Sequence, residues 1–140
     1  MLFFNRMVVV CLSAGFIASA VSAESALNDR YKQSYISQVT PMIEQQLLAA
    51  NGGIAKADLK SEASVWAEKM ASCQLEAIEH YPSNYREASV KPVANGGDIV
   101  KVTNDVNQLM KSDFEAGSLS LTSLQQLVAT AAQKFKKCMG

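Results

Sequence analysis

Apolar side chains recur along most of this chain at intervals of three and four residues, the repeat of one face of an α-helix. The pattern is clearest between Asp58 and Pro82, where charged side chains occupy the opposite face. We therefore expect a helix that Asp58 caps and Pro82 ends, with Trp66 in the core. Its apolar face consists of Leu59, Ala63, Trp66, Met70, Cys73 and Ala77.

Three more segments show the same spacing and predict helices over residues 25–39, 98–116 and 122–138. Asp98 is expected to cap the second of these and Gly117 to end it. Thr122, with Gln125 three residues later, is expected to cap the third. Their apolar faces are Leu27, Tyr31, Tyr35 and Val39; Ile99, Val102, Val106, Leu109 and Met110; and Leu124, Val128, Ala131, Phe135 and Cys138.

Two connections are less regular. Thr40-Pro41 either starts a second short helix over 41–50 or kinks one long helix, and the pattern is compatible with both. Residues 82–97 are expected to form the longest irregular connection, with a short turn over 85–88. Alternation of apolar and polar residues, the mark of strands, is almost absent. The predicted fold class is therefore all-α, a small bundle of four or five helices.

The amino-terminal residues 1–23 have the organisation of a secretory signal peptide. Arg6 supplies the positive charge, an apolar stretch of about 14 residues follows, and small residues precede possible cleavage after Ala20 or Ala23. The stretch is shorter than the roughly 20 residues that span a bilayer, so we expect cleavage rather than anchoring. The remaining residues 24–140 are expected to form a single helical domain that does not insert stably into a membrane.

The cysteines fit export to an oxidising compartment. Cys11 leaves with the signal peptide, which leaves Cys73 and Cys138, each on the apolar face of its predicted helix. Two facing helices bring such cysteines within bonding distance, so we predict one disulfide between them. No N-x-Ser/Thr glycosylation site follows residue 23, which favours a bacterial periplasm, with secretion as the alternative.

Charge and composition exclude some classes of partner and of chain. The chain has 13 basic and 13 acidic residues, so it has no net attraction for phosphate backbones, and nucleic acid is not expected as a partner. An apolar content of 49% argues against disorder.

Residues suited to catalysis are scarce. His80 is the only histidine, with Glu76 one helical turn before it, whereas zinc sites need three or four ligands. A nucleophilic triad needs a base, and here it would depend on this one residue at a helix end. Nucleotide-binding, hydrolase and covalent-haem motifs are absent. We therefore expect no catalytic, cofactor or metal-binding residues, and a protein that is not an enzyme.

Tyr81, Tyr85 and Arg86 are the candidate binding surface, because tyrosine and arginine are enriched at interfaces and these three fall in an expected loop. The alternative is that the tyrosines pack over helix ends. The leading hypothesis is a periplasmic protein that binds another protein as an inhibitor, an immunity partner, or an assembly or chaperone factor. The second hypothesis is a helical carrier of a small apolar ligand.

Overall fold

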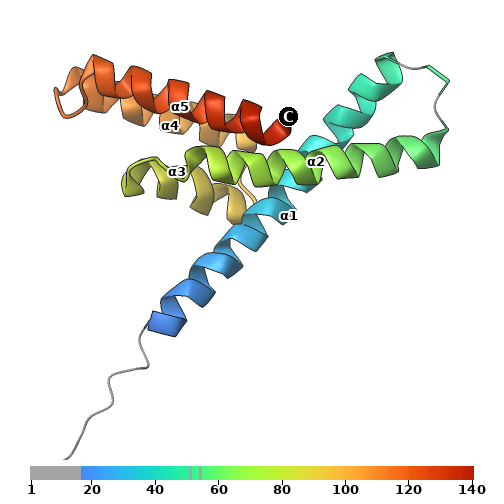
Figure 1. Cartoon of the computed structure of the whole chain (residues 1–140), viewed down its shortest axis with the longest axis horizontal. Helices are drawn as coiled ribbons and strands as arrows, with labels where there is room; N and C mark the ends of the chain where they lie inside the picture. Colours follow the sequence, from blue (N-terminus) through green and yellow to red (C-terminus); the bar gives the residue numbers. More distant parts are fainter. Residues whose placement is uncertain (1–16, 51, 54) are drawn as a thin grey trace, which may run out of the picture.

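The computed structural model describes residues 17–50, 52, 53 and 55–140. Every regular element in this part of the chain is an α-helix, which confirms the predicted all-α class (Figure 1). The helices are α1 (Ile17–Ala50), α2 (Lys56–Ile78), α3 (Ser83–Ala94), α4 (Ile99–Glu115) and α5 (Leu121–Met139). Most of the predicted signal peptide lies outside the described residues, and its last part, with Ala20 and Ala23, lies in α1.

Helix α1 is one continuous helix of 34 residues with Pro41 inside it, so the alternative of a separate short helix over 41–50 is wrong. Proline removes one hydrogen-bond donor but does not end the helix here, because packing on both sides supports it. Helix α1 crosses α2 and also packs on α3 (Figure 1). Its predicted apolar face is buried at Tyr31, Tyr35 and Val39.

Helix α2 buries a row of small residues that lets neighbouring helices approach closely. Ala63, Ala67 and Ala71 are all fully buried. The prediction that Asp58 caps this helix is wrong, because the helix begins at Lys56 and its cap residue, Ala55, makes no side-chain cap bond. Asp58 instead lies in the first turn, where its charge favours the helix dipole.

Trp66 was expected in the core and is 42% exposed. Helix α5 covers this face of α2 only as far as Lys69, whose Nζ donates to the carbonyl oxygen of Met139 over 2.7 Å. One turn earlier α5 no longer covers α2, and the Lys69 ammonium lies 5.9 Å from the Trp66 ring centre. The exposure of Trp66 therefore depends on where α5 ends.

Residues 82–97 were expected to be irregular, and this prediction is wrong because 83–94 form helix α3. Pro92 lies inside its last turn. The helix is stabilised by the burial of Tyr85, Val90 and Val93 against its neighbours, which outweighs a modest intrinsic propensity. The following turn needs Gly97, since a Cβ there would lie 2.8 Å from the Pro92 carbonyl oxygen.

The predicted residues at both ends of α4 are confirmed, whereas the predicted cap of α5 is wrong. Asp98 caps α4, its Oδ1 accepting from the Lys101 amide over 2.7 Å, and Gly117 adopts a positive φ of 77° after it. Helix α5 is capped by Ser120, whose Oγ accepts from the Ser123 amide, rather than by Thr122. Val128 was also placed on the buried face and is 52% exposed, whereas Leu124 and Leu127 pack against the core.

The predicted disulfide between Cys73 and Cys138 is present and joins the carboxyl-terminal part of α2 to the end of α5. The two Cα atoms are 5.5 Å apart, and the side chain of Cys73 is completely buried. In the turn just after α2, His80 Nε2 lies 3.1 Å from the carbonyl oxygen of Leu127. Helix α5 is thus held at two levels, to α2 and to the turn after it, although it has no fully buried residue of its own.

Candidate functional site

The three residues of the predicted binding surface have different environments. Tyr85 is only 4% exposed, and its hydroxyl donates to Asp113 Oδ2 over 2.6 Å, which joins α3 to α4. Burial, and secondly this bond to a carboxylate, raise the pKa of Tyr85. In this structure Tyr85 packs inside the molecule, as the alternative interpretation of the sequence expected.

Tyr81 and Arg86 come together at a surface groove of about 430 Å³ between α1 and α3. Arg86 makes an ion pair with Glu24, and Leu27 forms part of the apolar wall. Both partners of this ion pair are substantially exposed, so the pair contributes little to stability.

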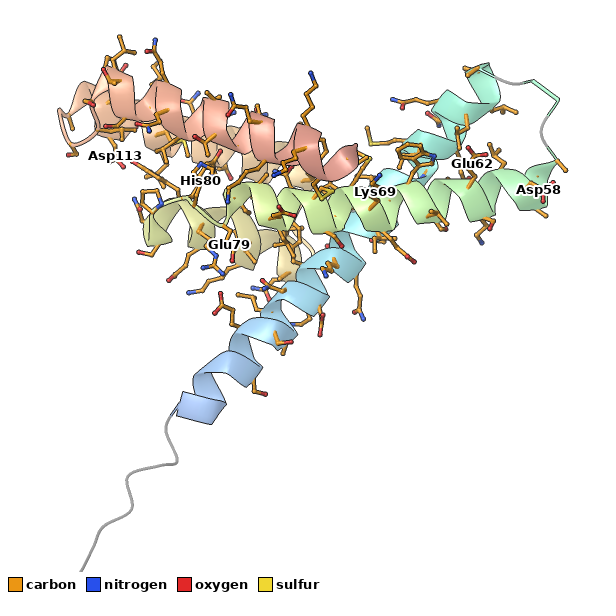
Figure 2. The ribbon with its side chains drawn as sticks, viewed as in Figure 1. Asp58, Glu62, Lys69, Glu79, His80 and Asp113 are labelled. Carbon is orange, nitrogen blue, oxygen red and sulfur yellow. A yellow bond between two sulfur atoms is a disulfide. The ribbon has the colours of Figure 1, made fainter. Side chains whose placement is uncertain are left out.

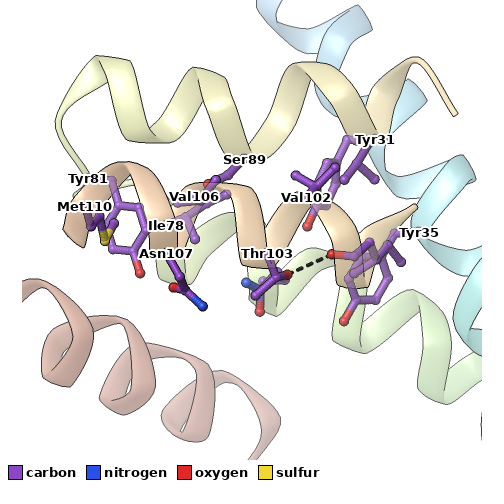
Figure 3. A pocket seen from close by; sticks show the side chains of 13 residues that line it. Tyr31, Tyr35, Ile78, Tyr81, Ser89, Val102, Thr103, Val106, Asn107 and Met110 are labelled. Carbon is purple, nitrogen blue, oxygen red and sulfur yellow. Dashed lines mark hydrogen bonds between the residues drawn. The ribbon is translucent and has the colours of Figure 1, made fainter. Parts of the chain in front are cut away.

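A cavity of about 280 Å³ opens between the first four helices (Figure 3). In this view Tyr81 and Met110 lie at one end and Tyr31 and Tyr35 at the other. The sequence had placed Tyr31 and Tyr35 on a buried face, but their spacing of four residues could not show that a cavity lies beside them. The lining consists of Tyr31, Tyr35, Gln74, Ile78, Tyr81, Ser89, Val93, Ile99, Val102, Thr103, Val106, Asn107 and Met110.

Two tyrosines of this cavity, Tyr31 and Tyr35, are buried, and the third, Tyr81, is half-buried. The rings of Tyr31 and Tyr35 stack with their centres 5.7 Å apart. Burial raises the pKa of both, and the neighbouring Tyr35 raises that of Tyr31 further. Burial also raises the pKa of Tyr81. All three phenols are therefore protonated, and able to donate hydrogen bonds, at neutral pH.

A further apolar groove lies between the carboxyl half of α1 and the amino end of α2, and we call it the arm groove. Its volume is about 420 Å³, and it is lined by Pro41, Glu44, Gln45, Leu48, Lys56 and Leu59. These two helix ends project from the other helices as a hairpin (Figure 1). Figure 2 labels Asp58 and Glu62 on this part of α2, and Lys69 where α5 ends.

Trp66 lies on the same face of α2 as the arm groove. Seven residues, or two turns, separate it from Leu59 in the groove, and seven more separate it from the disulfide at Cys73. We call the projecting hairpin of these two helix ends the arm. The arm groove and Trp66 together give it an apolar surface with charged side chains at its rim. Leu48 is 51% exposed in this surface. In the sequence, only its position at the end of the helical pattern pointed to this exposure.

His80 lies at the contact between α2 and α5 (Figure 2). Its Nδ1 is buried and is the one such side-chain atom without a hydrogen-bond partner in the part of the chain that the structure describes. Over the same residues there is no group of three or more side chains placed to hold a metal ion. His80 therefore joins the turn after α2 to α5 through Leu127.

Comparisons of the chain with protein-family models, with curated proteins and with solved structures find no match. Among the described helices, none is both long enough and apolar enough to span a membrane.

Proposed function

We propose that this chain is an exported, non-enzymatic protein of the bacterial periplasm that binds another protein through the arm groove. Such a protein would act as an inhibitor, an immunity partner, or an assembly or chaperone factor. The observation that carries the proposal is the apolar surface formed by the groove and Trp66 on a projecting helical hairpin. The residues 1–23 and the disulfide support export, because disulfides persist in oxidising compartments.

The composition of this surface is that of a protein-binding site. An apolar centre with a charged rim is the usual anatomy of an interface, and tryptophan is among the residues that contribute most to binding. Pro41, Leu48 and Leu59 supply the apolar part of the groove, and Glu44 and Lys56 the charged rim. The expected partner therefore presents an apolar side chain flanked by charges of both signs.

A rigid frame lowers the entropy cost of binding through this arm. The amino end of α2, which forms one side of the arm groove, continues into the carboxyl part of α2 that the disulfide at Cys73 joins to α5. This side of the groove is therefore carried on a held helix, which lowers the conformational entropy lost when a complex forms.

The test is affinity capture from periplasmic extract with the oxidised protein as bait, comparing single variants. Leu48→Ala and Trp66→Ala are expected to reduce recovery of a stoichiometric partner by about tenfold or more. Leu121→Ala is the matched control, because Leu121 is 54% exposed but lies at the start of α5, outside the groove. Equal recovery with all variants, or no stoichiometric partner, would refute the proposal.

The cavity between α1 and α4 favours a second candidate function, a helical carrier of a small ligand. Its volume of about 280 Å³ is just below the roughly 300–1,000 Å³ typical of small-molecule pockets. Small molecules of fragment size would fit it. Chemical-shift changes in cavity residues on addition of such molecules would support this function, and their absence would remove it.

A further inference from the structure

The cavity between the first four helices, which we call the tyrosine cavity, contains tyrosine hydroxyls that form no hydrogen bond within the described part of the chain. We propose that it binds a small uncharged molecule with an apolar body and an oxygen acceptor, such as an aromatic or aliphatic alcohol, ketone or amide. The proposal rests on the second candidate function and specifies its ligand, which is amphipathic rather than purely apolar.

The cavity contains phenol hydroxyls that have no hydrogen-bond partner within the helices and turns that the structure describes. Tyr31 is 3% exposed and Tyr35 is 7% exposed, and both line the cavity. Neither hydroxyl, nor that of Tyr81, has a hydrogen-bond partner among the described residues. The three phenol oxygens are not sealed from solvent, since they are absent from the buried side-chain atoms that lack a partner, so a ligand oxygen that accepts from them would replace water as their partner.

The side chains that line the cavity are uncharged. None of the thirteen lining residues is acidic, basic or a histidine. A charged ligand would lose its hydration here without gaining a counter-ion, and that loss is large. The cavity therefore selects uncharged molecules.

The cavity has an apolar wall along α4 and a polar opening. Val102 and Met110 both line it and lie eight residues apart on α4, which corresponds to about 12 Å of helix. Apolar side chains between them, including Val106, form one wall, whereas the exposed Thr103 and Asn107 mark the opening. A ligand with an apolar body fits this wall, and its oxygen faces the phenols.

The test is a titration of the isotope-labelled, disulfide-bonded protein, followed by amide chemical shifts, with three compounds of similar size. The compounds are 2-phenylethanol, which is neutral with an oxygen, ethylbenzene, which is apolar, and phenylacetate, which is anionic. We expect 2-phenylethanol to shift the amides of Tyr31, Val102 and Val106. Its affinity should exceed that of ethylbenzene by roughly fivefold, the effect of one hydrogen bond. Phenylacetate should cause no shifts at these positions.

Variants connect this preference to the phenols. Tyr31→Phe and Tyr35→Phe keep the rings and remove the hydroxyls, so at least one should lower the affinity for 2-phenylethanol to that for ethylbenzene. Val128→Ala is the control, because Val128 is 52% exposed on α5 and lies outside the cavity lining, and it should leave the affinity unchanged.

The outcomes separate the two proposals. Equal affinity of the wild-type protein for 2-phenylethanol and ethylbenzene would overturn the ligand class and leave the carrier function standing. If neither compound binds, both the ligand class and the carrier function are overturned. Binding of phenylacetate in the cavity would overturn the selection against charge.

Discussion

The hydroxyl of Tyr85 on α3 donates a 2.6 Å hydrogen bond to a carboxylate oxygen of Asp113 on α4, across 28 residues of sequence. The tyrosine is buried, so water competes little for its hydroxyl, whereas the Asp113 carboxylate is half-buried. It fixes the position of α4, which supplies one wall of the tyrosine cavity.

Tyr85→Phe is expected to lower the free energy of unfolding by about 1–3 kcal/mol, because it removes a hydrogen bond to a charged acceptor and leaves the carboxylate without its partner. Denaturant unfolding measures this change. Asp113→Asn retains an acceptor oxygen and should cost less than Tyr85→Phe. An unchanged stability in Tyr85→Phe would contradict the role given to this bond.

Replacing Cys73 by Ser is expected to lower the free energy of unfolding by roughly 2–5 kcal/mol, since the disulfide restricts the unfolded chain and α5 has few other deep contacts. Thermal unfolding under oxidising conditions measures the effect. Adding reductant to the wild-type protein should reproduce it, and adding reductant to the variant should change nothing. Two free thiols in protein purified from the periplasm would contradict the expectation.

Gly97→Ala is expected to destabilise the protein by about 1–3 kcal/mol, because the new Cβ would lie 2.8 Å from the backbone oxygen of Pro92, which cannot move without disturbing the end of α3. Gly52→Ala is the control, since no atom lies within 4 Å of a Cβ at that position. Equal stability of the two variants would show that the turn after α3 adapts to a side chain.

All four tyrosines have a raised pKa in the folded protein, with burial as the largest cause at each. Absorbance at 295 nm should therefore show the native protein ionising at higher pH than the urea-unfolded chain. The unfolded state loses its phenol protons near pH 10, before the folded state does. The resulting stability is fully present below about pH 10 and is lost as the pH rises through the folded-state values. Coincident native and unfolded titration curves would contradict the burial of these phenols.

The sequence alone determined the features that depend on neighbours within a few turns of helix. The three- and four-residue spacing identified the helical class, and the local chemistry of Asp98 and Gly117 marked the ends of α4. It also placed Cys73 and Cys138 on inward faces, which was enough to predict their disulfide. These features follow from side-chain direction along a single helix.

Tertiary structure decided what depends on where separate helices cross and end. Packing kept α1 continuous through Pro41 and made a helix of 83–94. The end of α5 left Trp66 exposed, although its spacing matches that of its buried neighbours. The cavity arises because α1 and the turn after α2 place Tyr31 and Tyr81, 50 residues apart in sequence, at its two ends. Periodicity specifies which face of a helix is apolar, but helix lengths and crossings determine what covers it.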